Sequence, residues 1–514
     1  MAREVTRRQL LGQAGTAAAG IAGLSVVGCS SHPAAATSRP LGGTVVPDAK
    51  VVDGYRSFVT RPDINPPVIT LARKITGSQA QYFFMNAPVS GPGRGGAMIL
   101  DPNGDLVWMS PDVPGAHKLD FNLQTYQGKP VLTTWEGVET LDWGQGVAVV
   151  ADTSFRTMHT LHAHGTGLKF DHHEFNLTPW GTALLTVYQT LDHIDLTAVG
   201  GPQDGVLETG ICQEVDIATG KLVWEWRSWD HVPLDETHQP FAYKDKKFGI
   251  ASNPFDYFHI NSLAPTADGE HLLISSRNCW CVYKVKRLTG EIVWRLGGKK
   301  SDFTLGPGVR FYFQHHVRPH GPDDSTLTVF DNGASPQEEP QSRALVLDVD
   351  ESKMHVTLRH AYTHPDQKLL ASAMGSTQLL PNGNVVVGWG TNSYFSEFSQ
   401  DGKLLVAGAM TQGNPSYRVF SYPWTGHPTG SPDVVARHAS HGATVYVSWN
   451  GATEVKSWAI LAGKSRSALA PVGSGRRAGF ETAIAVRNSG PYFAVRALDS
   501  KGNVLATSAT VKIS

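Results

Sequence analysis

The chain has little excess of either charge, few cysteines and no long hydrophobic run after its N-terminus. Its 514 residues carry a formal net charge of −1, so it lacks the basic surplus with which proteins bind nucleic acid. No stretch of about 20 apolar residues follows the N-terminal segment, which excludes a later membrane-spanning helix. We therefore expect no nucleic-acid partner.

The four cysteines are too few and too poorly spaced for a disulfide framework. Cys279 and Cys281 lie two apart, so on a strand they would share a face about 7 Å apart, too far for an unstrained bridge. A bridge from Cys212 stays open in an oxidising compartment. A Cys-Trp-Cys metal or redox pair is the alternative hypothesis, and buried structural thiols are the interpretation that we favour.

The N-terminus is typical of an export signal. A twin-arginine pattern, Thr6-Arg-Arg-Gln-Leu-Leu11, precedes an apolar stretch that ends in the lipoprotein-type box Val26-Val27-Gly28-Cys29. We expect residues 1–29 to be a signal peptide, with lipidation of Cys29 and residues 30–60 as a flexible tether and lead-in. The protein would then be lipid-anchored at the cell surface, on the outer face of the cell membrane. A plain signal peptide with an incidental cysteine is the alternative.

A histidine recurs at the start of successive strand-turn-strand segments. The chain has 53 glycines and 31 prolines, which favours an all-β fold with many turns. The segments are His173–Gly181, His259–Gly269 and His315–Asp324, and a fourth, Ser376–Gly383, has serine in the histidine position. If these segments belong to propeller blades, the same position in each blade lies beside the central axis. Three imidazoles would then meet in one funnel.

A hairpin with a glycine-containing turn recurs between these segments. Its copies are Ile99–Trp108, Val215–Trp224, Val285–Trp294 and Phe398–Leu405. One such hairpin after each histidine segment makes a four-stranded blade, which predicts a β-propeller. After a break rich in proline and glycine, strands of period two predict a small β-sandwich of immunoglobulin or fibronectin III type over residues 435–514.

One blade brings three different polar groups to one point. His259 and Asn261 are two apart and therefore share a strand face. The return strand ends at Ser275-Ser-Arg277, and tight antiparallel pairing brings this arginine near the start of its partner strand. Arginine binds tetrahedral oxyanions through its planar fork, and asparagine adds a neutral donor.

His315 and His173 would arrive from neighbouring blades. We expect no carboxylate in the inward position, although Asp171 and Glu174 flank His173. The site therefore suits a multiply oxygenated anion such as a sulfuryl or phosphoryl group, whose transfer depends on positioning and positive donors. Neutral imidazole is also a competent nucleophile, so neither a metal nor another cofactor is required.

These residues resemble the bacterial arylsulfotransferases (arylsulfate sulfotransferases), and in particular their actinobacterial and fungal branch, over about residues 60 to 425. The match is most specific at His259-x-Asn261 followed by Arg277. Gln314-His315 is similar to the segment whose histidine accepts the sulfuryl group. His173 resembles the histidine of the first active-site blade, with the adjacent His172 as its rival.

The resemblance implies a six-bladed propeller, here residues 61–425, and sulfuryl transfer from a phenolic sulfate ester to a phenol through a sulfohistidine. It implies that His315 is the nucleophile, that Asn261 and Arg277 bind the transition state, and that His259 and His173 transfer protons or bind charge. The chain departs from the family in three ways. It lacks a matching cysteine pair near the site, it has His316 where the branch often has an acid, and it ends in a sandwich.

Two other functions stay open, as does the oligomeric state. His173, His259 and His315 could ligate a metal, although the positive Arg277 argues against a bound cation. The propeller and sandwich could also form a non-catalytic surface receptor.

Two smaller groups of residues have competing interpretations. His162 and His164 are a possible metal pair but fit solvent-facing strand positions better. Tyr312, Phe313 and Trp389 could hold an aryl ring, although such residues in blades are mostly core.

Overall fold

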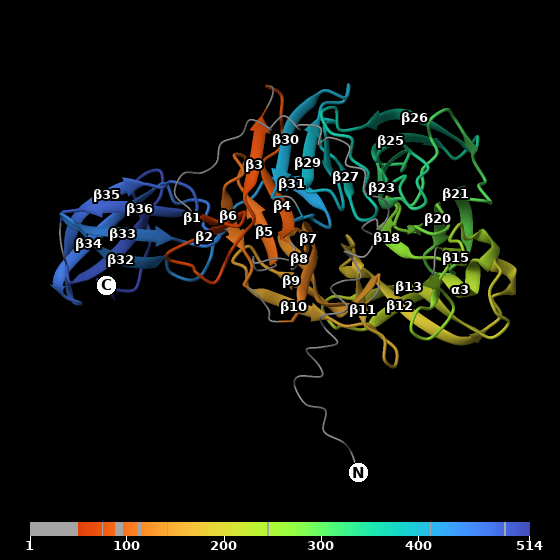
Figure 1. Cartoon of the computed structure of the whole chain (residues 1–514), viewed down its shortest axis with the longest axis horizontal. Helices are drawn as coiled ribbons and strands as arrows, with labels where there is room; N and C mark the ends of the chain where they lie inside the picture. The colour runs from red at the N-terminus through yellow and green to blue at the C-terminus, as the bar shows by residue number, and fades with distance from the viewer. Residues whose placement is uncertain are drawn as a thin grey trace, which may run out of the picture.

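The computed structural model describes residues 50–73, 76–87, 96–111, 115–140, 142–243, 246–411, 413–487 and 490–514. The all-β prediction is confirmed, because strands form nearly all the regular structure of these residues (Figure 1). None of their helices has the length and apolarity needed to cross a membrane. The predicted signal peptide, Cys29 and most of the tether lie outside the described residues.

Antiparallel four-stranded units follow one another along the chain. The first three are β31 (Val419–Tyr422) with β4 (Tyr82–Ala87), β5 (Gly96–Leu100) and β6 (Leu106–Met109); β7 (His117–Tyr126), β8 (Lys129–Thr140), β9 (Trp143–Ala151) and β10 (Thr157–Leu161); and β11 (Phe170–Leu177), β12 (Thr182–Ile194), β13 (Gly205–Asp216) and β14 (Leu222–Arg227). The second and third units are continuous in one nine-stranded sheet, because Phe170 of β11 pairs with Gly146 of β9. The next three are β18 (Ile260–Pro265), β19 (His271–Ser276), β20 (Cys281–Lys286) and β21 (Ile292–Gly297); β23 (His315–His320), β24 (Thr326–Asp331), β25 (Arg343–Asp350) and β26 (His355–Tyr362); and β27 (Ser376–Leu379), β28 (Val385–Gly388), β29 (Tyr394–Phe398) and β30 (Leu404–Met410).

Short elements decorate these units. They are β1 (Lys50–Val52), β2 (Tyr55–Ser57), β3 (Ile69–Arg73) beside β30, β15 (Ala242–Tyr243), β16 (Lys246–Lys247), β17 (Phe255–Asp256) parallel to β13, β22 (Thr304–Leu305) beside β26, and the helical turns η1 (Thr197–Val199), α3 (Ser228–His231) and η2 (Leu234–Glu236). The recurring hairpins form as predicted, with Trp108 opposite Ile99, Trp224 opposite Glu214 and Trp294 opposite Lys284.

The six inner strands, β7, β11, β18, β23, β27 and β31, are linked to one another in a closed series (Figure 1). Side chains make each link: Gln124 of β7 with Leu177, Asn176 of β11 with Leu263, Ser262 of β18 with Val317, His316 of β23 with Thr377, Gln378 of β27 with Ser421, and Tyr422 of β31 with Asn122. Strand β31, from the far end of this series, completes the sheet that begins with β4.

Apolar side chains fill the space between neighbouring units. Val282 and Leu296 of the fourth unit, for example, share one core with Val329 and Leu345 of the fifth. A strand that packs one face against each of two neighbouring units buries both of its faces, so most of its side chains are buried. The polar residues at the starts of the inner strands lie inside the ring that these sheets form.

The C-terminal residues form two further sheets with one shared core. One contains β32 (Asp433–Ala439), β33 (Gly442–Ser448) and β36 (Glu481–Val486); the other contains β34 (Ser457–Ser465), β35 (Ala468–Arg476), β37 (Tyr492–Leu498), β38 (Val504–Thr507) and β39 (Val511–Lys512). Val445, Trp458 and Val495 lie in the core between them. This unit, at the left in Figure 1, contacts the edge of β6, where the Asn450 side chain bonds both the N–H and the C=O of Met109.

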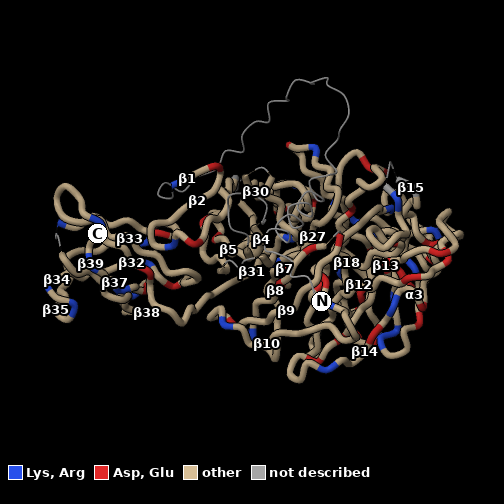
Figure 2. The backbone as a smooth tube through the Cα atoms, turned by 60° about the horizontal axis from the view of Figure 1, so that its bottom comes forward, with Lys and Arg blue, Asp and Glu red and all other residues tan. Residues whose placement is uncertain are grey.

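Both signs of charge are scattered over the chain in Figure 2, without a large region of one sign. This distribution agrees with the net charge of −1.

Candidate active site

The three histidine segments begin with β-bulges. In β18, Ile260 lies opposite Ser276 but Ser262 lies opposite Ser275, and β11 and β23 show similar shifts just after their starts. His259 has a positive φ of 51°, a conformation that non-glycine residues seldom adopt. The serine-bearing strand β27 pairs without a shift. Bulges turn side chains to new directions, so the simple strand alternation predicted for His259 and Asn261 is not what aims them.

His173 and His259 meet directly. Their Nε2 atoms are 3.1 Å apart, and their rings cross at 85° with centroids 4.7 Å apart. Both rings are buried, with 4% and 0% of their residues' surface exposed. Two strands from separate units therefore bring their imidazoles into hydrogen-bond contact, as the recurrence in the sequence predicted for this pair.

Carboxylates hold the outer nitrogen of each of these rings, contrary to the expectation that none would join the site. Asp171 Oδ1 lies 2.5 Å from His173 Nδ1, and Asp256 Oδ2 bonds His259 Nδ1. Asp256 ends the short strand β17, and the positive φ at His259 folds the imidazole back toward it. The signal in the sequence was the spacing Asp256-x-x-His259.

His315 is held by an amide. Its Nδ1 lies 2.7 Å from Asn332 Oδ1, while Asn332 Nδ2 donates to the carbonyls of Ala371 and Met374, both at 3.1 Å. Those two carbonyls fix the amide so that its oxygen faces the ring, which assigns the proton of His315 to Nδ1. The Nε2 atom therefore carries a lone pair, which accepts a long hydrogen bond from the N–H of Met374 at 3.3 Å. Asn332 was not among the predicted residues.

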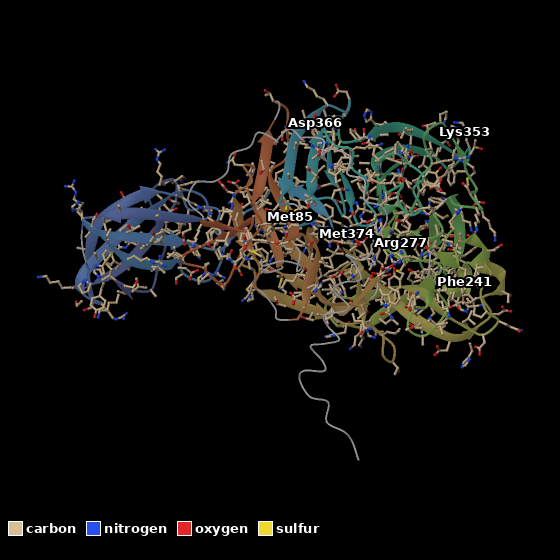
Figure 3. The ribbon with its side chains drawn as sticks, in the orientation of Figure 1. Met85, Phe241, Arg277, Lys353, Asp366 and Met374 are labelled. Atoms are coloured by element: carbon tan, nitrogen blue, oxygen red, sulfur yellow. The ribbon has the colours of Figure 1, made fainter. Side chains whose placement is uncertain are left out.

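Arg277 directly follows β19, and Figure 3 shows it on the side of the ring that carries β18. Its N–H donates to the carbonyl of His259 at 2.9 Å, as the predicted pairing required. The guanidinium lies over Phe313 at 4.2 Å, and its Nη2 is 3.6 Å from Asp256. Nη2 is also 3.8 Å from Asp142, and Nε donates to Asn278 at 3.1 Å. Both carboxylate distances are longer than a close charge-assisted hydrogen bond, so the Nη atoms keep donors for an oxyanion.

Asn261 is fully buried and links two strands. Its Nδ2 donates to the carbonyl of Gln314 at 2.6 Å, directly before His315. Its Oδ1 has no partner among the described residues. In this structure Asn261 fixes the segment that carries His315.

His172, the alternative to His173, takes no part in the contact between the rings of His173 and His259. Its ring stacks on His173 at 4.3 Å and meets the edges of Trp135 and Tyr417, both at 5.5 Å. Of the two adjacent histidines, His173 is therefore the one that reaches His259.

Burial keeps the imidazoles neutral. It lowers the pKa of His173, His259 and His315 well below the ordinary value, and the charge of Arg277 lowers all three further. Burial has the opposite effect on the acid beside them, raising the pKa of Asp256 to about 6.

Arg418 is a buried residue that the sequence reasoning missed. Its Nη2 donates to the carbonyls of His173 and Asn261 at 2.7 and 3.2 Å, and its Nη1 bonds Asp120 and Glu174 at 2.7 and 3.1 Å. It directly precedes β31, in the strand-start position that holds histidine in other units. That position was the only signal for it in the sequence.

The site residues do not fit a metal ion. Asp171, His172 and His173 place possible ligand atoms within 4.8 Å of one another. However, Asp171 Oδ1 is bonded to His173, and its Oδ2 accepts the N–H of Gly144 at 2.6 Å. For three histidines as ligands, a cation would have to break the contact between His173 and His259 beside the positive Arg277.

Aromatic rings surround the imidazoles. Tyr188 lies 5.5 Å from His259 and 5.8 Å from His173, and it stacks on Trp143 at 5.7 Å. Of the predicted aryl-binding residues, Phe313 underlies Arg277, and Tyr312 lies next to it in the chain.

The remaining candidates have structural roles. Trp389 belongs to the core, and His164 bonds the carbonyl of Gly220 at 2.8 Å while His162 is exposed. Cys212, Cys279 and Cys281 are free and buried, and burial raises the pKa of the Cys279 thiol to about 12. These thiols therefore fit the favoured interpretation of structural residues.

Comparison with known proteins identifies the family. Residues 122–411 match the model of the family described as Arylsulfotransferase (ASST), and no curated protein matches the chain.

Solved structures similar to the chain include TolB from Acinetobacter baumannii (14% identity, 66% of this chain and 65% of that one, TM-score 0.37) and the periplasmic gluconolactonase of Pseudomonas aeruginosa (11%, 66% and 99%, 0.36). Another is the β-propeller domain of Cps50 (Swd1) from Myceliophteria thermophila (11%, 64% and 93%, 0.31). Similarities at this level do not decide function. The family match covers more than half of the chain, which therefore belongs to the arylsulfotransferase (ASST) family and is an arylsulfotransferase-like enzyme.

Proposed function

We propose that the protein moves a sulfuryl group from a phenolic sulfate ester to a phenolic acceptor by a ping-pong mechanism through a sulfohistidine on His315. The observation that carries this proposal is the hydrogen bond from His315 to Asn332, which leaves the lone pair on Nε2, where it accepts only a long bond of 3.3 Å from the N–H of Met374 among the described residues. His173 and His259, by contrast, occupy each other's Nε2 atoms. Their contact suits proton transfer rather than attack on sulfur.

In the first half-reaction His315 Nε2 attacks the sulfur atom. The N–S bond forms as the bond from sulfur to the phenolic oxygen breaks, and the leaving oxygen takes the electron pair and a proton. Arg277 binds the sulfuryl oxygens, whose charge is spread in a loose transition state. Trp143 and Tyr188 lie where an aryl ring could stack.

The amide of Asn332 also suits the second half-reaction. The sulfated ring keeps its Nδ1 proton, because an amide oxygen accepts a hydrogen bond but cannot take the proton away. The adduct is therefore an imidazolium and a good leaving group. The acceptor phenol attacks sulfur, the N–S bond breaks, and the phenol proton passes to the groups beside His259.

We propose further that residues 61–425 form a six-bladed propeller and that residues 435–514 form a β-sandwich of immunoglobulin or fibronectin III type. The closed series of inner strands supports the first assignment, and the single core between the two C-terminal sheets supports the second.

The proposed location is the outer face of the cell membrane, after twin-arginine export and lipidation of Cys29. Only the sequence motif of residues 1–29 supports it. In cells, Cys29→Ala should move the protein from the membrane fraction to the soluble exported fraction. Cytoplasmic wild-type protein would overturn the proposal of export, and unchanged membrane association of the variant would overturn the proposed lipidation.

The activity is tested with 4-nitrophenyl sulfate and a phenol. The protein should release nitrophenolate in a burst, and steady turnover should need the acceptor. Peptide mass mapping of quenched protein should find the sulfuryl group on His315. Steady release with water alone would indicate a sulfatase, and an adduct on another residue would overturn the assignment of the nucleophile.

A further inference from the structure

Four side chains form an unbroken row of three hydrogen bonds in the site. Asp171 bonds His173 at 2.5 Å, His173 bonds His259 at 3.1 Å, and His259 bonds Asp256. Each of these bonds needs one proton between its two atoms. Two neutral imidazoles supply only two protons, so the row is complete only when it holds a third.

The alternative with two protons is unfavourable for two reasons. If both carboxylates bind Nδ1–H groups, the Nε2 lone pairs of His173 and His259 face each other at 3.1 Å. The row would also carry a charge of −2 in a buried site, where unpaired charge is costly.

With three protons the charge is −1, and one guanidinium balances it. Arg277 lies 3.6 Å from Asp256 and is the cation beside the row. Arg418 does not balance the charge of the row, because Asp120 and Glu174 already pair with it. Burial lowers the pKa of both imidazoles and raises that of Asp256 to about 6, so the third proton fits on the carboxyl of Asp256, with His259 donating from Nε2.

We propose that Asp171, His173, His259 and Asp256 are one proton-holding unit, in which the carboxylates are positioning residues and the third proton is exchanged with the substrate. This use of the proton rests on the proposed function. In the first half-reaction the unit gives the proton to the leaving phenolic oxygen and falls to two protons. In the second half-reaction the acceptor phenol returns a proton, and the unit again holds three.

Other titratable groups lie near this unit. Although burial alone would raise it, the bond to His117 and the nearby His172 and His173 lower the pKa of Glu139, so this acid is ionised, but it is bonded to His117 and not to the row. Burial raises the pKa of Glu208 to about 8, so this acid is mostly protonated. Tyr188 and Tyr417 donate their hydroxyl protons to the carbonyls of Ile260 and His173. His172, His315, Arg277 and Arg418 also act on the row.

The variant Asp256→Asn tests whether Asp256 gives a proton to the substrate or only positions the ring of His259. The amide can donate to His259 Nδ1 and keep the row bonded, but it has no acidic proton to give. Transfer from phenyl sulfate, whose poor leaving group needs a proton, should fall about a hundredfold or more. Transfer from 4-nitrophenyl sulfate should fall less than about tenfold, because nitrophenolate leaves without one.

The matched control is Asp204→Asn, which alters an exposed aspartate–histidine pair with His193 (3.0 Å) outside the site. This control variant should change neither the rate of transfer from phenyl sulfate nor that from 4-nitrophenyl sulfate. Equal losses with both donors in Asp256→Asn would overturn the proton role, and a surviving adduct on His315 would show that the proposed function still stands.

Nitrogen-15 NMR of histidine in the resting wild-type protein gives a second test that needs no turnover. A hydrogen-bond coupling between the two Nε2 atoms should be strong near pH 5 and fade as the pH rises past about 6, where Asp256 gives up the third proton. Two bare Nε2 atoms at pH 5 would overturn the inference.

Discussion

The two ends of the inner strands differ sharply in how they use polar residues. At their starts, bulges and a positive φ bring buried imidazoles, carboxylates and a guanidinium together. Toward their other ends, the strands line a cavity of about 620 Å³ in which Gln378 exchanges two hydrogen bonds with the backbone of Ser421, at 2.8 and 3.1 Å. Gln124 bonds β11 in the same manner, at 2.7 Å to both Leu177 and Phe175. The far-end amides are committed to joining neighbouring strands, whereas the near end keeps groups free for chemistry.

A buried ion network lies between the two ends. Glu174 binds Arg318, which lines the cavity, at 2.8 Å and Arg418, which holds the site backbone, at 3.1 Å. Asp120 binds Arg418 at 2.7 Å and completes a group with two cations and two anions. The inner strands therefore have three roles along their length: reaction at their starts, charge pairing in the middle and ring closure at their other ends.

The largest expected effect is at the start of β23. His315→Ala should lower turnover of 4-nitrophenyl sulfate by at least about a thousandfold, because removing a nucleophile removes the covalent route. Stopped-flow absorbance should show no burst, while thermal unfolding stays near that of the wild type. His162→Ala, at an exposed position, serves as the control. A burst of wild-type size in His315→Ala would contradict the assignment.

The second-largest expected effect is a loss of stability when the buried ion network in the middle of the inner strands is broken. Arg418→Ala leaves Asp120 without its buried cation and Glu174 with Arg318 alone, which should lower the free energy of unfolding by about 3–5 kcal/mol. Urea denaturation measures it. The control Arg156→Ala removes an exposed pair with Asp152 and should cost less than about 1 kcal/mol. Similar small losses in both variants would show that the network is not needed for folding.

A smaller effect on rate is expected at Arg277. Arg277→Lys should slow sulfuryl transfer about a hundredfold with little change in unfolding temperature, because an ammonium cannot fork two oxygens. The loss should fall on kcat more than on KM, since the interaction strengthens as charge develops. Unchanged kcat would mean that Arg277 only holds Phe313 and the turn at residues 277–280.

The recurrence in the sequence predicted part of the site because strand starts repeat. Histidines 173, 259 and 315 all lie near the starts of inner strands, and hairpin pairing places Arg277 beside His259. The carboxylate prediction was wrong because Asp256 reaches His259 through a turn with positive φ rather than through strand alternation. Asn332 could not be predicted, because loop carbonyls about forty residues later orient its amide.

The fold, like the site, was predicted only in part from the sequence. Glycine turns and alternating residues indicated the hairpins, because pairing within a hairpin depends on residues close in the sequence. Closure of the ring depends on β31 meeting β4 across more than three hundred residues. Arg418 enters the site only through that closure, so its role depends on contacts that no local pattern encodes.

The smallest effect tests the far end. Gln378→Ala removes both bonds to Ser421 but touches no site residue, so it should lower the free energy of unfolding by about 1–2 kcal/mol and leave kcat and KM within about twofold. Urea denaturation and steady-state kinetics on the same preparation check both parts. The control Gln203→Ala removes an exposed side-chain amide away from the cavity. A kcat that falls with Gln378→Ala while stability holds would mean that ring closure and reaction are coupled along the strands, because no direct contact could carry the change to His315.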